Sequence, residues 1–183
     1  LRNQFIRYSE AVQDYQQSLE DETYATVLQP RTLAETEGVP AAVYTSKAFL
    51  IEAERQANEY YRGLPVTVGM MDLDKEIKVE FLKGFSKNSA KTEKLMKDYF
   101  QVEHKLLAAF IELHELCSKA DVEFKLSTNQ ILFYKDRELE KYNQLIEQVS
   151  LLTVEESTII NMISALEIET SKKFLDHRRA AGI

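Results

Sequence analysis

Residues 122–146, VEFKLSTNQILFYKDRELEKYNQLI, interrupt the helical pattern of this chain and then restore it. Apolar and polar residues alternate over 122–126, which is typical of a β-strand. From Leu139 onward the apolar residues recur at steps of three and four, which is typical of a helix. We therefore predict a small two-stranded β-hairpin near residues 122–133, inserted into a mainly helical protein.

The turn of this hairpin contains no glycine. Four polar residues, 127–130, separate the two arms, and Asn129 is the one that adopts the left-handed conformation at low cost. A loop with one extended arm is the alternative. Asp136 follows the second arm and is expected to cap the next helix.

Two segments before the hairpin have the apolar spacing of amphipathic helices. The first covers residues 1–19. The second starts near Val43 and carries small residues that would let a neighbouring helix approach closely. Between them, residues 29–40 hold two prolines and a glycine, so we expect a connecting loop there. Gly63 and Pro65 are expected to end the second helix.

A third helical pattern begins at Asp72, which is expected to be its N-cap, and continues to Cys117. Gly84 and the polar residues 86–89 interrupt the apolar spacing, and such residues permit a kink or a break. The sequence is therefore compatible with one continuous helix over 75–118 and with two shorter helices.

After the hairpin, one helix is expected from Asp136 and a separate last helix from Thr153, because Thr153 and Glu156 form a capping box. The last helix would turn its apolar residues inward: Ile159, Ile160, Ile163, Leu166 and Phe174. We expect one domain over residues 1–183, mainly α, built as an antiparallel bundle of four or five helices with one long member and the hairpin.

Composition narrows the classes of function. The 183 residues are 44% hydrophobic and 29% charged, and the net charge is −7, so no cationic face for nucleic acid is expected. Cations near the end of the last helix are expected to suit the helix dipole rather than to bind lipid: Lys172, Lys173, Arg178 and Arg179.

The chain has one cysteine, which excludes a disulfide within the chain. The longest uninterrupted apolar run, residues 106–111, is much shorter than the roughly 20 residues of a membrane span, so a soluble chain is expected. Because the sequence starts at Leu1 rather than at methionine, we expect a leader, a lipid anchor, a membrane helix or a trimmed end before it.

No residue set has the layout of a metal or catalytic site. A carboxylate-bridged metal bundle needs Glu-x-x-His pairs, and the residues three before the histidines are Gln101, Ile111 and Phe174. His114 and Cys117 share a helical face, but two ligands do not make a zinc or copper site, so both are expected to be packing residues.

Serines lack a glycine-flanked elbow, and the glycines are too scattered for a phosphate-binding loop. We therefore expect no enzyme activity, no catalytic residues and no cofactor. The tyrosines on or beside the helical seams are expected to pack in the core rather than to form a ligand cage: Tyr8, Tyr15, Tyr60, Tyr61, Tyr99 and Tyr142.

Residues 129–133, NQILF, followed after eight residues by 142–146, YNQLI, give the pattern Asn-x-Ile-x-Phe, eight residues, Tyr-Asn-x-Leu-Ile. This pattern resembles one found in a family of uncharacterised gammaproteobacterial lipoproteins and covers about a tenth of the chain. The resemblance implies a periplasmic cell-envelope protein, tethered by a lipidated cysteine upstream of Leu1. It assigns no catalytic residues.

The same residues suggest a structural motif made of Asn129, Ile131, Phe133, Tyr142 and Asn143. Asn143 lies four after Leu139, on the side expected to face inward, where an amide needs a partner. We expect its amide to bond the main chain of the hairpin or of the preceding connection, while Phe133 and Tyr142 pack the hairpin onto the bundle.

The leading functional expectation is a non-enzymatic, lipid-anchored envelope protein that acts through contacts with other proteins or the cell wall. The alternative is an extracytoplasmic ligand-binding sensor domain of a membrane receptor, whose first and last helices would run side by side toward the membrane. A cytoplasmic or phage-encoded adaptor is the third reading. The sequence names neither a partner nor an oligomeric state.

Overall fold

The computed structural model describes residues 2–20 and 26–181, with side chains placed for most of them up to 166 and for 168. Within these ranges the helices are α1 (Arg2–Glu20), α3 (Pro30–Glu35), α4 (Ala41–Met70), α5 (Lys75–Lys119) and α6 (Asp136–Ala181). The strands are β1 (Val122–Lys125) and β2 (Gln130–Phe133). The predicted class, a mainly α bundle with a β-hairpin, is confirmed.

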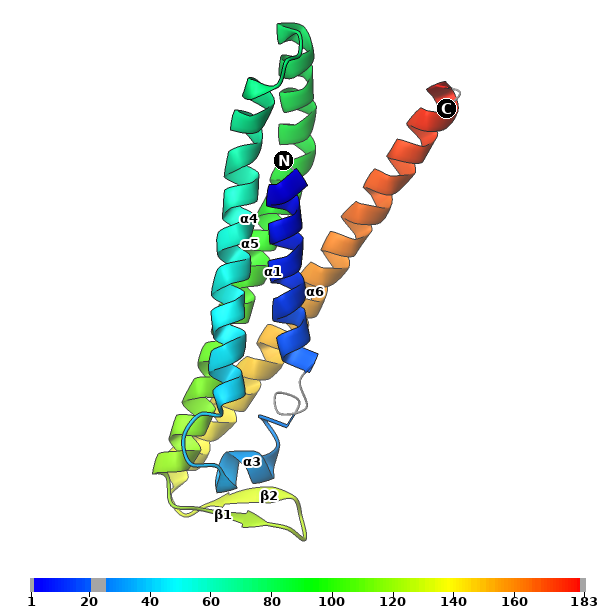
Figure 1. Cartoon of the computed structure of the whole chain (residues 1–183). Coiled ribbons are helices and arrows are strands. Elements are labelled where there is room, and N and C mark those ends of the chain that lie inside the picture. Colours follow the sequence, from blue (N-terminus) through cyan, green and yellow to red (C-terminus); the bar gives the residue numbers. More distant parts are fainter. Residues whose placement is uncertain (1, 21–25, 182–183) are drawn as a thin grey trace.

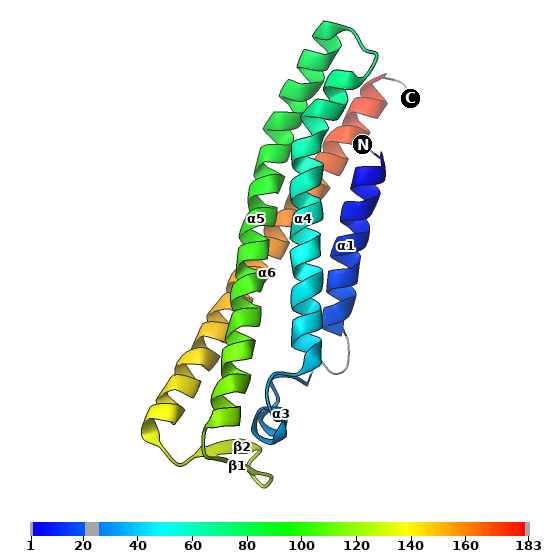
Figure 2. The same cartoon turned by 60° about the vertical axis from the view of Figure 1, so that its left-hand side comes forward.

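The four long helices run up and down the molecule, and α3 and the hairpin close one end of it (Figure 1). Helix α1 packs on α4, and α5 packs on both α4 and α6. Beyond its first half, α6 leans away from the other helices, which Figure 1 shows in orange and red. Figure 2 shows from a second side that α1 begins and α6 ends at the same end of the bundle.

The core divides into two clusters along α5. The larger one joins α1, α4, α5 and the middle of α6, with Tyr15, Leu50, Val102 and Leu107 nearly or fully buried. The smaller one lies at the hairpin end and contains Leu33, Leu113, Cys117 and Leu145. On α6, the side chains that the structure places in these clusters extend as far as Ile163.

Small residues on α4 allow close packing against α1, as predicted. Ser46, Ala53 and Ala57 are buried, and the hydroxyl of Ser18 donates a hydrogen bond of 3.1 Å to the Ser46 hydroxyl. This close approach is typical of helix pairs with small residues at the contact.

The expectation that Gly63 and Pro65 end the second helix is wrong, because α4 continues through both to Met70. Proline removes one backbone hydrogen bond, but tertiary packing of Leu64 and Val68 keeps the helix going. Gly63 has a different role: a Cβ atom there would lie 2.7 Å from the Gln4 amide nitrogen of α1.

Helix α5 is one continuous helix of 45 residues, which decides between the two predicted forms. Its N-cap is Asp74 rather than Asp72, and the Asp74 side chain makes no capping hydrogen bond. The helix carries ion pairs at the spacing of one turn, including Lys94 with Asp98 at 2.8 Å and Lys97 with Glu93 at 2.6 Å. Such pairs each add a few tenths of a kcal/mol to a helix.

The expectation of a loop over residues 29–40 is partly wrong, since Pro30–Glu35 forms α3. Proline is well suited to the first position of a helix, where its missing N–H is not needed. Leu33 is fully buried in the smaller core cluster, and α3 contacts both strands. The amide of Gly38 then donates to the Ser118 hydroxyl at 2.9 Å, which fixes the connection onto α5.

The hairpin has the predicted place, but its turn covers residues 126–129 rather than 127–130, because Gln130 already belongs to β2. Its strands are antiparallel, with Val122 opposite Phe133 and Phe124 opposite Ile131. Asn129 has a φ of 52°, the left-handed conformation expected for it. The side chains of Ile131 and Phe133 pack against the smaller core cluster.

Helix α6 continues without interruption from Asp136 to Ala181, so the two helices predicted after the hairpin are one. The expected capping box is wrong: the Thr153 hydroxyl donates to the Val149 carbonyl oxygen at 2.9 Å within the helix. Asp136 is in the first turn rather than before it. Ile159 is buried as expected, but Ile160 is 42% exposed, so the expectation that it faces inward is wrong. The side chains of Phe174 and of the four terminal cations lie outside the described ones.

Among the described residues, one helical segment is long and apolar enough to cross a membrane, Asp136–Leu166 of α6. The longest uninterrupted apolar run missed this segment, because serine, threonine, asparagine and the pair Glu155 and Glu156 divide it into short apolar runs. Only 11% of its most apolar window is buried. Several of its apolar side chains, including Leu151, Val154 and Met162, are therefore not used by the core.

Candidate functional site

A buried carboxyl group connects three helices in the middle of the bundle. Glu103 of α5 is 2% exposed, and the Tyr15 hydroxyl of α1 donates a short hydrogen bond of 2.5 Å to its Oε2 atom. Its Oε1 atom is also buried. Glu156 of α6 and Tyr99 of α5 are close enough to change its ionisation. The cluster Tyr15, Tyr99, Glu103 and Glu156 therefore spans α1, α5 and α6.

Burial raises the pKa of Glu103 to about 7, because a carboxylate is poorly solvated in the core. The Tyr15 phenol opposes this shift by donating to the charged form. Glu156 raises the pKa further, through repulsion between two carboxylates and through a hydrogen bond that favours the protonated acid. The arrangement can hold a proton near neutral pH and release it as the pH rises.

From the sequence, Glu103 was considered only as a possible further metal ligand beside His114 and Cys117, although its position signals a buried acid. It lies four residues after Tyr99 and three before Leu106, so it belongs to the apolar seam of α5. A charged residue on a seam is unusual and marks either a paired group or a group with a shifted pKa. The next residue, His104, is partly buried, and its Nε2 atom lies 2.9 Å from the Oε2 atom of Glu54 on α4.

The second feature is the outer face of α6. Leu151, Val154 and Met162 are 66%, 67% and 51% exposed, and they lie on the side of the helix away from Leu152 and Ile159, which are buried. A helix with apolar residues on both sides is normally covered on both sides. We define the outer face of α6 by five exposed residues, which no other described part of the chain covers: Leu151, Val154, Thr158, Met162 and Ala165.

Hydroxyl groups do not make this face polar. Thr158 donates to the Val154 carbonyl oxygen at 2.8 Å, Ser157 to the Thr153 carbonyl at 2.9 Å and Ser150 to the Ile146 carbonyl at 3.0 Å. Because these donors are satisfied within the helix, covering them leaves no unpaired hydroxyl proton.

A groove of about 500 Å³ runs between α5 and α6 where α6 begins to lean away. Met162 and Ala165 line it from α6, so the groove adjoins the outer face. Its rim carries charges of both signs, with Lys91 and Lys105 on α5 and Glu155 on α6. The groove is thus apolar at its floor and mixed in charge at its edge.

His114 and Cys117 are both buried, as the packing interpretation predicts. The Nε2 atom of His114 lies 3.0 Å from the Val27 carbonyl oxygen, so this nitrogen carries the proton. Burial lowers the pKa of His114 and raises the pKa of Cys117 to about 11, which keeps both groups neutral. Among the described residues, no group of three or more candidate ligands gathers around a common point.

The predicted motif at the hairpin is brought together only in part. The rings of Phe133 and Tyr142 lie 5.0 Å apart between centroids, and Ile131 packs beside them. Asn143, however, is exposed, so the expectation of an inward amide is wrong. The α6 helix turns Tyr142 and Leu145 toward the hairpin, and this rotation places Asn143 toward solvent.

The tyrosines behave as packing residues with contacts among themselves. Tyr8 of α1 stacks on Tyr60 of α4 at 5.7 Å, and Tyr61 meets Tyr60 edge-on at 5.3 Å. Burial raises the pKa of Tyr61. Such aromatic pairs add about 1 kcal/mol beyond the area they bury, so they explain the residues without a ligand.

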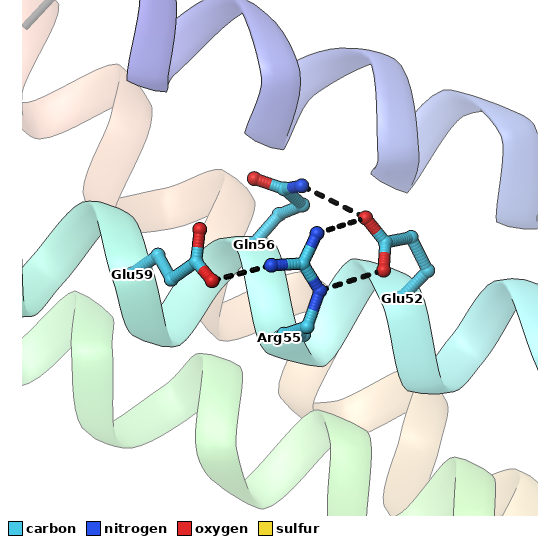
Figure 3. Close-up of polar contacts among 4 residues, drawn as sticks. All are labelled: Glu52, Arg55, Gln56 and Glu59. Carbon is cyan, nitrogen blue, oxygen red and sulfur yellow. Dashed lines mark hydrogen bonds and ion pairs between the residues drawn. The ribbon is translucent and has the colours of Figure 1, made fainter.

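An exposed ion-pair cluster on α4 is a weaker candidate (Figure 3). Arg55 binds Glu52 at 2.6 Å and also pairs with Glu59, and the Gln56 amide donates to Glu52 at 2.8 Å. Hydrogen bonds from Arg55 and Gln56 lower the pKa of Glu52 to about 2. All four residues belong to one helix, so the cluster supports α4 and joins no two elements.

No protein-family model matches the sequence, and neither a curated protein nor a solved structure was found that matches it.

Proposed function

We propose that this protein is a non-enzymatic, lipid-anchored protein of the cell envelope that acts through contacts made by the outer face of α6. The observation that carries the proposal is the exposed apolar surface at Leu151, Val154 and Met162. Exposed apolar surface of this kind is uncommon on soluble monomers and typically marks a contact site. The resemblance at residues 129–146 supports the location in the envelope.

The test is to place a photoreactive residue at Val154 of the full protein in its native cells. Irradiation should produce adducts in the envelope fraction. The matched control is the same residue at Ile51, which is an exposed apolar position on α4. The proposal is wrong if the protein fractionates with the cytosol, or if Val154 gives no more adduct than Ile51.

A second candidate is an extracytoplasmic ligand-binding sensor domain of a membrane receptor. It is favoured by the arrangement of α1 and α6, because α1 begins and α6 ends at the same end of the bundle (Figure 2). The groove between α5 and α6 would then be the ligand site. Mass spectrometry of the native protein separates the two: an N-terminal acyl group supports the anchored protein, and hydrophobic segments at both ends support the receptor.

A further inference from the structure

The outer face of α6 has an internal symmetry that the core does not require. Its five residues are separated by steps of three, four, four and three, so the pattern reads the same from both ends around Thr158. All five are exposed. Steps of three and four form the seam through which two helices pack side by side.

When two identical helices pack antiparallel about a two-fold axis, a seam with this spacing places its own positions opposite one another. With a two-fold axis at Thr158, Val154 of one copy faces Met162 of the other, and Leu151 faces Ala165. Each pair joins a larger side chain to a smaller or more flexible one, which lets the helices approach evenly. In a two-fold interface the same surface serves both partners.

The charges around the seam fit a second copy of the chain better than a partner whose surface carries charge of a single sign. The rim of the adjoining groove carries Lys91 and Lys105 on α5 and Glu155 on α6. A surface with both signs can face its own copy without net repulsion, whereas a uniformly charged rim could not.

A lipid bilayer is the competing cover, since the same segment is long enough to cross one. The segment contains Glu155 and Glu156, and carboxylates are costly inside a bilayer. Glu156 is also engaged with Glu103 in the core. Transfer of this helix into lipid would break that contact, whereas a second copy leaves it in place.

We propose that two copies of this chain associate through α6, antiparallel and in register about Thr158. This inference rests on the proposed function in that it names the partner of the same face. In this dimer, the groove between α5 and α6 of each copy lies next to α6 of the other copy.

The first test is sedimentation velocity of the full chain up to about 100 μM, where an association with a Kd of about 1 μM is nearly complete. Wild type should sediment as a dimer, with twice the chain mass of 21.2 kDa. Val154→Asp should weaken the dimer at least about tenfold, because each copy then buries an unpaired charge. Ile51→Asp, the same change at an exposed apolar position on α4, should leave the dimer intact.

The register is tested by cysteine cross-linking under oxidation, with wild type as the control for buried Cys117. Thr158→Cys should form covalent dimers by itself. Ala165→Cys should not do so alone, but should cross-link when mixed with Leu151→Cys. Cross-linking of Ala165→Cys alone would show a parallel arrangement and overturn the register.

A wild type that remains monomeric at all concentrations would overturn the dimer. So would a dimer that Val154→Asp leaves unchanged. A monomer that binds vesicles through Val154 would replace the second copy by a membrane. A monomer whose Val154 still cross-links to another envelope protein would remove this inference and leave the proposed function standing.

Discussion

Two neighbouring side chains lower the free-energy cost of burying Glu103 in the core. The Tyr15 hydroxyl satisfies one oxygen, and the carboxyl of Glu156 favours protonation of the group. A neutral acid loses far less solvation energy on burial than a carboxylate does. The position on the α5 seam could be recognised in the sequence, but its partners could not, because they come from two other helices.

The first prediction concerns the pH dependence of stability. Because the pKa of Glu103 is raised from 4.5 to about 7, the folded state binds the proton more tightly than the unfolded state. The stabilisation is fully present below about pH 4.5 and is lost as the pH rises through about 7. Glu103→Gln should remove this dependence and raise the free energy of unfolding at about pH 8 by a few kcal/mol relative to wild type.

Urea unfolding of wild type and Glu103→Gln at about pH 5 and about pH 8 measures this effect. Glu112→Gln, on an exposed position of the same helix, is the matched control and should keep the wild-type dependence. If the free energies of unfolding of wild type and Glu103→Gln change equally between these two pH values, Glu103 is ionised at both and the explanation is wrong.

The second prediction concerns the hairpin turn at Asn129, whose left-handed conformation was correctly predicted. A β-branched residue is strained at a φ of 52°, so Asn129→Val should lower the free energy of unfolding by about 1–2 kcal/mol. Asn129→Gly should be neutral or slightly stabilising, since glycine adopts this conformation readily. Urea unfolding checks both, and an equal loss in the two variants would contradict the explanation from backbone conformation.

At the scale of elements, periodicity predicted the long helices and the hairpin, but local signals misplaced several ends. Gly63 and Pro65 were read as stops, and Thr153 with Glu156 as a start, although α4 and α6 continue through these positions. A local signal contributes about 1–3 kcal/mol, and packing on either side of it outweighs that amount. Helix α3 was missed because six residues are too few to show a period.

A third prediction follows for α3. Leu33 is fully buried and joins α3 to the hairpin and to α5, so Leu33→Ala should lower the free energy of unfolding by about 2–5 kcal/mol. Thermal melting measures the loss. Leu126→Ala, at a 79% exposed leucine of the hairpin, should be nearly neutral. A Leu33 variant as stable as wild type would mean that α3 is not docked.

A fourth prediction concerns the proline inside α4. Pro65 is exposed and removes one backbone hydrogen bond from the helix. Pro65→Ala restores the N–H donor and should raise the free energy of unfolding by roughly 1–3 kcal/mol. Val66→Ala, at the next exposed position, controls for a general gain in helix propensity. A loss of stability in Pro65→Ala would show that the proline relieves a strain elsewhere.

At the scale of the whole molecule, the outer face of α6 is a surface that the core does not explain. The described core packs around α5, yet Leu151, Val154 and Met162 on this face are exposed. The sequence could show that α6 is apolar, but only the structure shows which side of it the core leaves uncovered. Contact through α6, with a second copy as the partner, explains its composition, its palindromic spacing and its separation from the bundle together.

Hydrogen–deuterium exchange at two protein concentrations tests this claim most directly, because it reports which backbone amides become protected. We expect peptides covering residues 151–165 of α6 and 91–105 of α5 to exchange more slowly at about 100 μM than at about 1 μM, with α4 unchanged. Exchange in α6 that is the same at both concentrations would contradict the account.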